Sequence, residues 1–126
     1  MNVETPRRLM LAEMFEAFNR HDFDEVLSHL DDDVAWPNMI EMTVLHGREQ
    51  VRAYWDDQLT RSIPTVTPVR FVDDGEEIVV IVDQRVAREG QVAQSTVAHR
   101  YTFNGARIAA MLVEPVESTK GAADSA

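Results

Sequence analysis

One segment in the middle of the chain, residues 31–59 with the sequence DDDVAWPNMIEMTVLHGREQVRAYWDDQL, most constrains the fold. The three aspartates at 31–33 predict an acidic turn, and a short strand that ends in Trp-Pro-Asn follows, where Pro37 excludes an ordinary central-strand position. An irregular crossing follows, and a His-Gly-Arg motif then opens an amphipathic helix over about 48–61. This order indicates a curled sheet that helices close over, with a pocket inside.

The segments before and after this unit differ in their predicted secondary structure. Two helices are expected before it, at about 6–20 and 23–30, because apolar residues recur there at helical spacing. After it, the turn signals Asp-Asp-Gly, Glu-Gly and Asn-Gly separate four β-rich segments within residues 66–113. The predicted class is therefore α+β, with four strands in an antiparallel meander and no βαβ series. We expect one domain over residues 1–116 and a flexible tail over 117–126.

Charge and composition narrow the function classes. The formal net charge is −10, so a nucleic-acid or anionic-membrane partner is not expected, because both require a basic surface. The chain has no cysteine, which excludes disulfides and thiolate chemistry. No segment reaches the ~20 apolar residues of a membrane span, and residues 1–15 lack the apolar run of a secretory signal. We therefore expect a cytoplasmic location.

Five groups of short motifs follow one another in a characteristic order and spacing through residues 6–115. They are FEAFN with HDFD at 15–24, DDV at 32–34, HGRE at 46–49, YW at 54–55 and YTFNG at 101–105. Together they resemble the nuclear transport factor 2-like superfamily, in its SnoaL-like or ketosteroid isomerase-like branch. The resemblance implies a cone-shaped, strongly curved, mostly antiparallel sheet wrapped by three N-terminal helices, with a single apolar pocket. It also implies a homodimer through the outer sheet face, which Val72, Val79 and Ile81 fit.

The catalytic residues of ketosteroid isomerases do not carry over to this sequence. By spacing, the resemblance places the aspartate base at Asn38, the oxyanion-hole tyrosine near Met14, and its protonated aspartate partner at His99. An amide cannot take up a proton as a carboxylate does. Steroid isomerisation by that mechanism is therefore not expected.

Two residues are nevertheless candidates for chemistry. His99 is expected on the inward face of its strand, where an imidazole can act as acid, base or hydrogen-bond donor. The alternative is a buried histidine with a structural hydrogen bond. Asn38 could orient a ligand carbonyl through its amide, or it could satisfy the backbone of the turn after Pro37.

Other residues are predicted to bind the ligand rather than to react. Trp36, Trp55 and Tyr101 are expected as aromatic walls, with Met14 beside them, and core packing is the alternative for the two tryptophans. Gln84 shares the parity of the inward β-branched residues of its strand. It is either a polar group near the pocket mouth or part of a solvated strand end.

The remaining titratable residues favour no metal or cofactor. Glu41 could serve as a displaced base if its loop folds inward, although loop carboxylates are usually solvated, and His46 is expected in a cap and turn. The four histidines have no recognised ligand spacing, and no phosphate-binding glycine loop is present. We therefore predict neither a metal nor a cofactor.

The combined prediction is a protein that binds an apolar small molecule. In its catalytic version, the protein is an isomerase, cyclase or hydrolase-like enzyme that acts on an apolar carbonyl compound. The alternative is a non-catalytic ligand-binding or dimeric interaction module, and a third possibility is a dimer whose core is filled and has no cavity. The sequence does not decide whether the protein is an enzyme.

Overall fold

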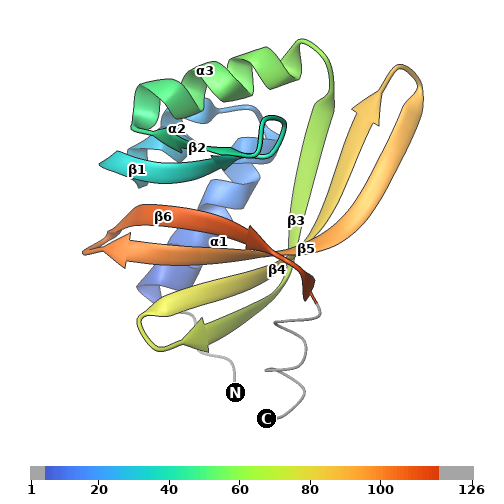
Figure 1. Ribbon diagram of the computed structural model, residues 1–126. Helices are drawn as coiled ribbons and strands as arrows, with labels where there is room; N and C mark the ends of the chain where they lie inside the picture. Colours follow the sequence, from blue (N-terminus) through green and yellow to red (C-terminus); the bar gives the residue numbers. More distant parts are fainter. Residues whose placement is uncertain (1–4, 117–126) are drawn as a thin grey trace.

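Three helices and one six-stranded sheet make up residues 5–116, the part of the chain that the computed structural model describes (Figure 1). The helices are α1 (Pro6–Asn19), α2 (Phe23–Ser28) and α3 (Arg48–Leu59). The strands are β1 (Leu30–Asn38), β2 (Thr43–His46), β3 (Ile63–Asp74), β4 (Glu77–Arg88), β5 (Gln91–Asn104) and β6 (Arg107–Glu114). The predicted α+β class is confirmed, whereas the predicted tail at 117–126 lies outside the described residues.

The sheet is mixed, with the strand order β2-β1-β6-β5-β4-β3. Strands β3 to β6 form the predicted antiparallel meander, and β1 joins its end by pairing parallel to β6. The three predicted turns lie between consecutive strands, and Gly75, Gly90 and Gly105 have positive φ there. Glycine adopts this conformation at little steric cost, which explains why these turn signals identified the meander correctly.

Two details of the first strand region differ from the prediction. The run Asp31 to Asp33 was expected in a turn, but β1 begins at Leu30 and includes all three residues. The aspartates lie between Leu30 and Ala35, which both pair with β6, and the register of this pairing shifts between those two residues. The flanking pairs thus keep the chain extended despite the low strand preference of aspartate. In addition, the predicted irregular crossing contains β2, which pairs antiparallel with the end of β1 and forms the edge of the sheet.

Contacts at the start of α3 fix this helix over the sheet. Gly47 has φ 89° and ψ 158°, and its N–H donates to the Val34 carbonyl at 2.8 Å. The Arg48 guanidinium donates from Nε and Nη2 to the Leu30 carbonyl at 3.0 and 2.7 Å. Because both acceptors lie on β1, the first turn of α3 has a defined position relative to that strand.

The C-terminal end of α1 is joined to the opposite edge of the sheet. Asn19 donates from Nδ2 to the Val66 carbonyl at 2.8 Å and accepts from the Val66 N–H at 2.9 Å. Its side chain therefore pairs with the edge strand β3 as a neighbouring strand would. Pro64 and Pro68 lie two residues before and after Val66, so their backbone nitrogens face the same free edge of β3. Proline has no N–H, and these two positions therefore offer no donor at that edge.

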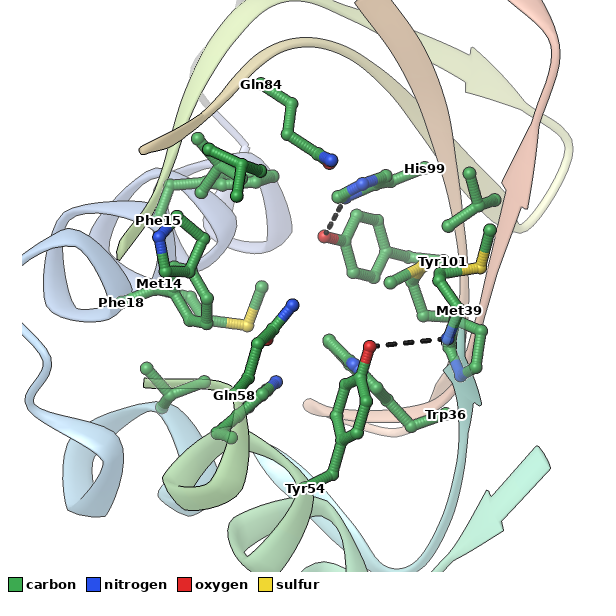
Figure 2. A pocket seen from close by; sticks show the side chains of 18 residues that line it. Met14, Phe15, Phe18, Trp36, Met39, Tyr54, Gln58, Gln84, His99 and Tyr101 are labelled. Atoms are coloured by element: carbon green, nitrogen blue, oxygen red, sulfur yellow. Dashed lines mark hydrogen bonds between the residues drawn. The ribbon is translucent and has the colours of Figure 1, made fainter. Parts of the chain in front are cut away.

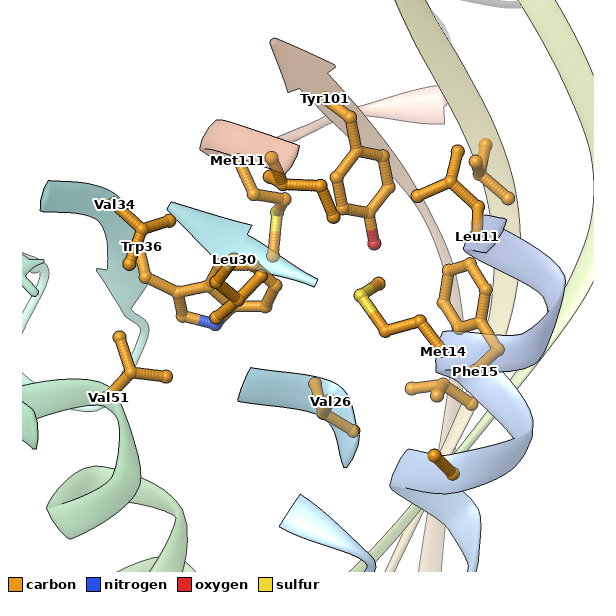
Figure 3. Close-up of a cluster of buried hydrophobic side chains, with 14 of the residues drawn as sticks. Leu11, Met14, Phe15, Val26, Leu30, Val34, Trp36, Val51, Tyr101 and Met111 are labelled. Carbon is orange, nitrogen blue, oxygen red and sulfur yellow. The ribbon is translucent and has the colours of Figure 1, made fainter. Parts of the chain in front are cut away.

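The main core lies between the helices and the inner face of the sheet (Figure 3). Residues such as Leu11, Val26 and Val34 are fully buried there. A smaller cluster, on the other face of β4 and β5, contains Val79 and Ile81, which are only 2% and 6% exposed within the single chain. These two residues therefore supply no exposed apolar surface for a partner, and dimerisation stays a prediction.

Candidate functional site

A cavity of about 130 Å³ lies inside the curled sheet, under α1 and α3 (Figure 2). All three helices and five of the strands contribute to its wall. The lining residues are Met14, Phe15, Phe18, Val26, Trp36, Pro37, Met39, Tyr54, Trp55, Gln58, Pro64, Val66, Gln84, Val86, His99, Tyr101, Met111 and Val113. A cavity of about 150 Å³ accommodates benzene, so this space suits a ligand of about one ring.

The lining is apolar and carries no formal charge. Five of its residues bear hydrogen-bonding side chains besides the indoles, namely Tyr54, Gln58, Gln84, His99 and Tyr101. Within residues 5–116, no aspartate, glutamate, lysine or arginine lines the cavity. An unpaired ion is costly to transfer into such surroundings, and the site therefore favours a neutral ligand.

His99 and Tyr101 form the polar centre of the β5 wall. Nδ1 of His99 lies 3.2 Å from the Tyr101 hydroxyl, and the imidazole stacks on Phe15 with a centroid distance of 6.1 Å. Burial lowers the pKa of His99 to about 4 and raises the pKa of Tyr101. At neutral pH both side chains are therefore uncharged, and they are joined by one neutral hydrogen bond.

The second ring nitrogen of His99 is available to a ligand. Within the described residues, Nδ1 is the only ring nitrogen of His99 that has a hydrogen-bond partner, and the residue is 7% exposed and lines the cavity. Two neutral tautomers are possible. If Tyr101 donates to Nδ1, Nε2–H can donate to a carbonyl; in the other tautomer, Nδ1–H donates to Tyr101 and Nε2 accepts from a hydroxyl.

The α3 wall carries a second set of polar side chains. The Tyr54 hydroxyl accepts the backbone N–H of Met39 at 3.3 Å, and burial raises the pKa of Tyr54. Gln58, one helical turn further along α3, is part-buried and its amide points into the cavity (Figure 2). Trp36 and Trp55 also line the cavity, and their rings meet edge-on with a centroid distance of 5.6 Å.

The structure brings together most of the predicted site residues. Met14, Trp36, Trp55, Gln84, His99 and Tyr101 all line the cavity. For Trp36 and Trp55 the sequence left open whether they form pocket walls or pack in the core. Both side chains do both, because they line the cavity and belong to the core. Gln84 is part-buried at the cavity, rather than in a solvated strand end.

Three other residues singled out in the sequence lie elsewhere. Asn38 does not line the cavity, and its Oδ1 accepts the N–H groups of Ile40 and Glu41, both at 3.0 Å. These two hydrogen bonds match the alternative in which Asn38 pairs with backbone N–H groups of the turn after Pro37. A role of Asn38 toward a ligand stays a prediction. Glu41 and His46 are exposed and lie outside the lining, which separates the nearest loop carboxylate from the cavity.

Tyr54, Gln58 and Met39 were not predicted as site residues. A signal for Gln58 was present, because a glutamine on the buried face of a predicted helix needs a polar neighbour or a cavity. Tyr54 precedes the core residue Trp55, and nothing in the local pattern turns it toward a pocket. Met39 lines the cavity only because the turn after β1 folds over it.

One cluster of possible metal ligands occurs away from the cavity. Glu13, Glu25 and His29 have ligand atoms within 4.8 Å of one another. However, Glu25 already pairs with Arg20 at 3.2 Å, and Glu13 is exposed. The two carboxylates are therefore explained as surface charges near a helix end, whereas Nε2 of His29 is buried and has no hydrogen-bond partner in the described residues.

Comparisons with known proteins identify the class of the fold. A protein of unknown function from Burkholderia pseudomallei, described as nuclear transport factor 2-like, is 28% identical with a TM-score of 0.79, covering 87% of this chain and 90% of that one. A putative polyketide cyclase from Xanthomonas campestris is 16% identical with a TM-score of 0.77, covering 86% and 89%. A Mycobacterium tuberculosis protein in complex with estradiol-17beta-hemisuccinate is 20% identical with a TM-score of 0.74, covering 85% and 91%. The fold is that of the nuclear transport factor 2-like, ketosteroid isomerase-like group.

Within that group, the chain belongs to the family of the SnoaL-like domain, whose sequence model matches residues 11–111. A search of curated proteins gives no match. No helix in residues 5–116 has the length and apolar character required to cross a membrane. The predicted family is thus confirmed.

Proposed function

We propose that this protein binds a small, neutral, mainly apolar carbonyl compound inside the cone. The observation that carries the proposal is the imidazole of the buried residue His99, which lines an uncharged apolar cavity and whose Nε2 has no hydrogen-bond partner in the described residues. In the tautomer where Tyr101 donates to Nδ1, the Nε2–H group donates to the ligand oxygen. The surrounding rings exclude water and contact the apolar body of the ligand.

The cavity volume limits the size of this ligand. Pockets for drug-sized molecules measure about 300–1,000 Å³, whereas the cavity here measures about 130 Å³. A neighbour of the same fold binds estradiol-17beta-hemisuccinate, but a steroid would require this cavity to widen. A compound with one ring, or with one ring inside and a substituent at the open end, is therefore favoured.

Catalysis is the second candidate function, and the His99–Tyr101 pair favours it. A neutral Nε2–H that donates to a carbonyl oxygen polarises the carbonyl, and Tyr101 supports that tautomer when its hydroxyl donates to Nδ1. The pKa of about 4 makes His99 a weak base at neutral pH. Carbonyl polarisation, as in an isomerase- or cyclase-type reaction, is thus supported better than strong proton abstraction. A neighbour with this fold is named a putative polyketide cyclase.

Thermal unfolding with matched ligands tests the binding proposal. Acetophenone and ethylbenzene have similar shapes, and only the ketone has an acceptor for Nε2–H. At 100 times its dissociation constant, a ligand should stabilise the wild type by about 2.7 kcal/mol. His99→Leu should remove the preference for the ketone, while His46→Leu, an exposed control, should keep it. Equal binding of both compounds by the wild type would disprove the role of His99.

The predicted homodimer and cytoplasmic location remain separate proposals. Relatives of this fold motivate the dimer, and light scattering coupled to gel filtration measures the mass directly. A mass of one chain, 14.3 kDa, at micromolar concentration would refute the dimer. The proposed ligand binding rests on neither the dimer nor the location.

A further inference from the structure

The polar side chains of the cavity fall into two groups on facing walls. Gln84, His99 and Tyr101 belong to β4 and β5, whereas Tyr54 and Gln58 belong to α3 (Figure 2). Figure 2 shows the Gln84 amide beside His99, and the Gln58 amide reaching into the cavity from the helix side. A ligand that fills the cavity therefore meets hydrogen-bonding groups at two opposite ends.

The Gln58 amide has no structural hydrogen bond in the described part of the chain. The backbone carbonyl of Gln58 accepts the N–H groups of Arg61 and Ser62 at 3.1 and 3.0 Å, and thereby ends α3. The side chain takes no part in this termination. Its two N–H donors and its carbonyl oxygen are thus free on the side that faces the cavity.

Tyr54 adds a donor beside this amide. Its oxygen already accepts the Met39 N–H at 3.3 Å, so its own O–H remains available to an acceptor. Burial raises the pKa of Tyr54, so the phenol keeps this proton. An amide next to a phenol offers both donors and acceptors, which matches a hydroxyl or a second carbonyl group.

We infer that the ligand carries an oxygen substituent at each end of one ring, as in a hydroxyaryl ketone, and that Gln58, supported by Tyr54, recognises the second oxygen. The inference rests on the proposed function, because it assumes that the first oxygen contacts His99. An apolar end against Gln58 would displace water from the amide without replacing its hydrogen bonds. A carboxylate end would be buried without a cation in the described lining.

Two ketones that differ by one group test the inference by titration calorimetry. Acetophenone supplies only the first oxygen, whereas 4-hydroxyacetophenone supplies both. We expect the wild type to bind the hydroxylated ketone about tenfold more tightly, the effect of one added hydrogen bond in a buried site. Gln58→Met keeps the length of the side chain and should abolish this preference, because it removes the amide that the hydroxyl contacts. Gln94→Met, an exposed glutamine on β5, is the matched control and should keep it.

The two proposals fail in distinguishable ways. If the wild type binds both ketones equally, the inference about Gln58 is wrong, and the role of His99 is unaffected. If Gln58→Met retains the tenfold preference, another group recognises the hydroxyl, and the inference is again wrong. If neither ketone binds better than ethylbenzene, the proposed function fails and the inference fails with it.

Discussion

The burial of His99 makes a specific prediction about how stability depends on pH. The ordinary pKa of 6.5 applies to the unfolded chain, and burial lowers the pKa to about 4 in the folded protein. Between these values the unfolded chain binds a proton that the folded protein does not. The contribution of the neutral His99 to the free energy of unfolding therefore has its full value above about pH 6.5, and it is lost as the pH falls toward 4.

The size of the effect follows from the same two values. Integrated over pH, His99 should cost the folded state about 2 kcal/mol between pH 7 and pH 5, because each unit of pKa difference corresponds to about 1.4 kcal/mol. Urea unfolding measures this loss. With a slope of about 1–3 kcal/mol per molar urea, the midpoint should fall by about 1 M from this residue alone.

A variant separates the contribution of His99 from every other contribution to the pH dependence of stability. His99→Gln replaces the imidazole with a neutral amide that can still bond Tyr101, so only the His99 contribution disappears. The difference in unfolding free energy between wild type and variant should shift by about 2 kcal/mol from pH 7 to pH 5. His46→Gln removes an exposed imidazole and should show no comparable shift relative to wild type. Parallel curves for wild type and His99→Gln would refute the buried, neutral imidazole.

Three further changes test contacts that hold the cone together. Gly47→Ala should cost about 1–3 kcal/mol in urea unfolding, because φ 89° with ψ 158° is accessible essentially only to glycine; a neutral result would contradict this backbone conformation. Asn19→Leu should cost about 1–3 kcal/mol because it leaves both backbone groups of Val66 unpaired, and hydrogen exchange at Val66 should accelerate. Arg100→Met should lower the free energy of unfolding by about 1 kcal/mol, because Arg100 forms ion pairs with Glu114, Asp74 and Glu77 at 2.7–2.8 Å. Salt should screen these pairs, so a cost that about 0.5 M salt leaves unchanged would argue against the network.

The predictable part of the fold was encoded in local patterns. The glycines at 75, 90 and 105 marked the turns of the meander, and strand parity placed Gln84 and His99 on the inner face. Each of these features depends on a few neighbouring residues and on glycine or β-branched side chains with strong preferences. Sequence spacing alone was therefore sufficient to bring these two cavity residues together.

The errors occurred where distant contacts decide the structure. The three aspartates at 31–33 favour a turn locally, but they lie in β1 between Leu30 and Ala35, which both pair with β6. The direction of Tyr54 depends on the rotation of α3, which Arg48 fixes through the Leu30 carbonyl, 18 residues away in the chain. For Asn38 the sequence left two roles open, and the contacts of its oxygen with the following turn match one of them.

The pairing of Asn19 with β3 also affects how this chain behaves toward other chains. A long edge strand normally offers a row of free N–H groups that can template edge-to-edge aggregation. At residues 64, 66 and 68, which share one edge, two prolines have no N–H and Asn19 occupies the third. The first half of the 12-residue edge strand β3 therefore presents no free donor at these positions. The opposite edge, β2, is only four residues long, so an open, curved sheet is protected from extension into a fibre without being closed into a barrel.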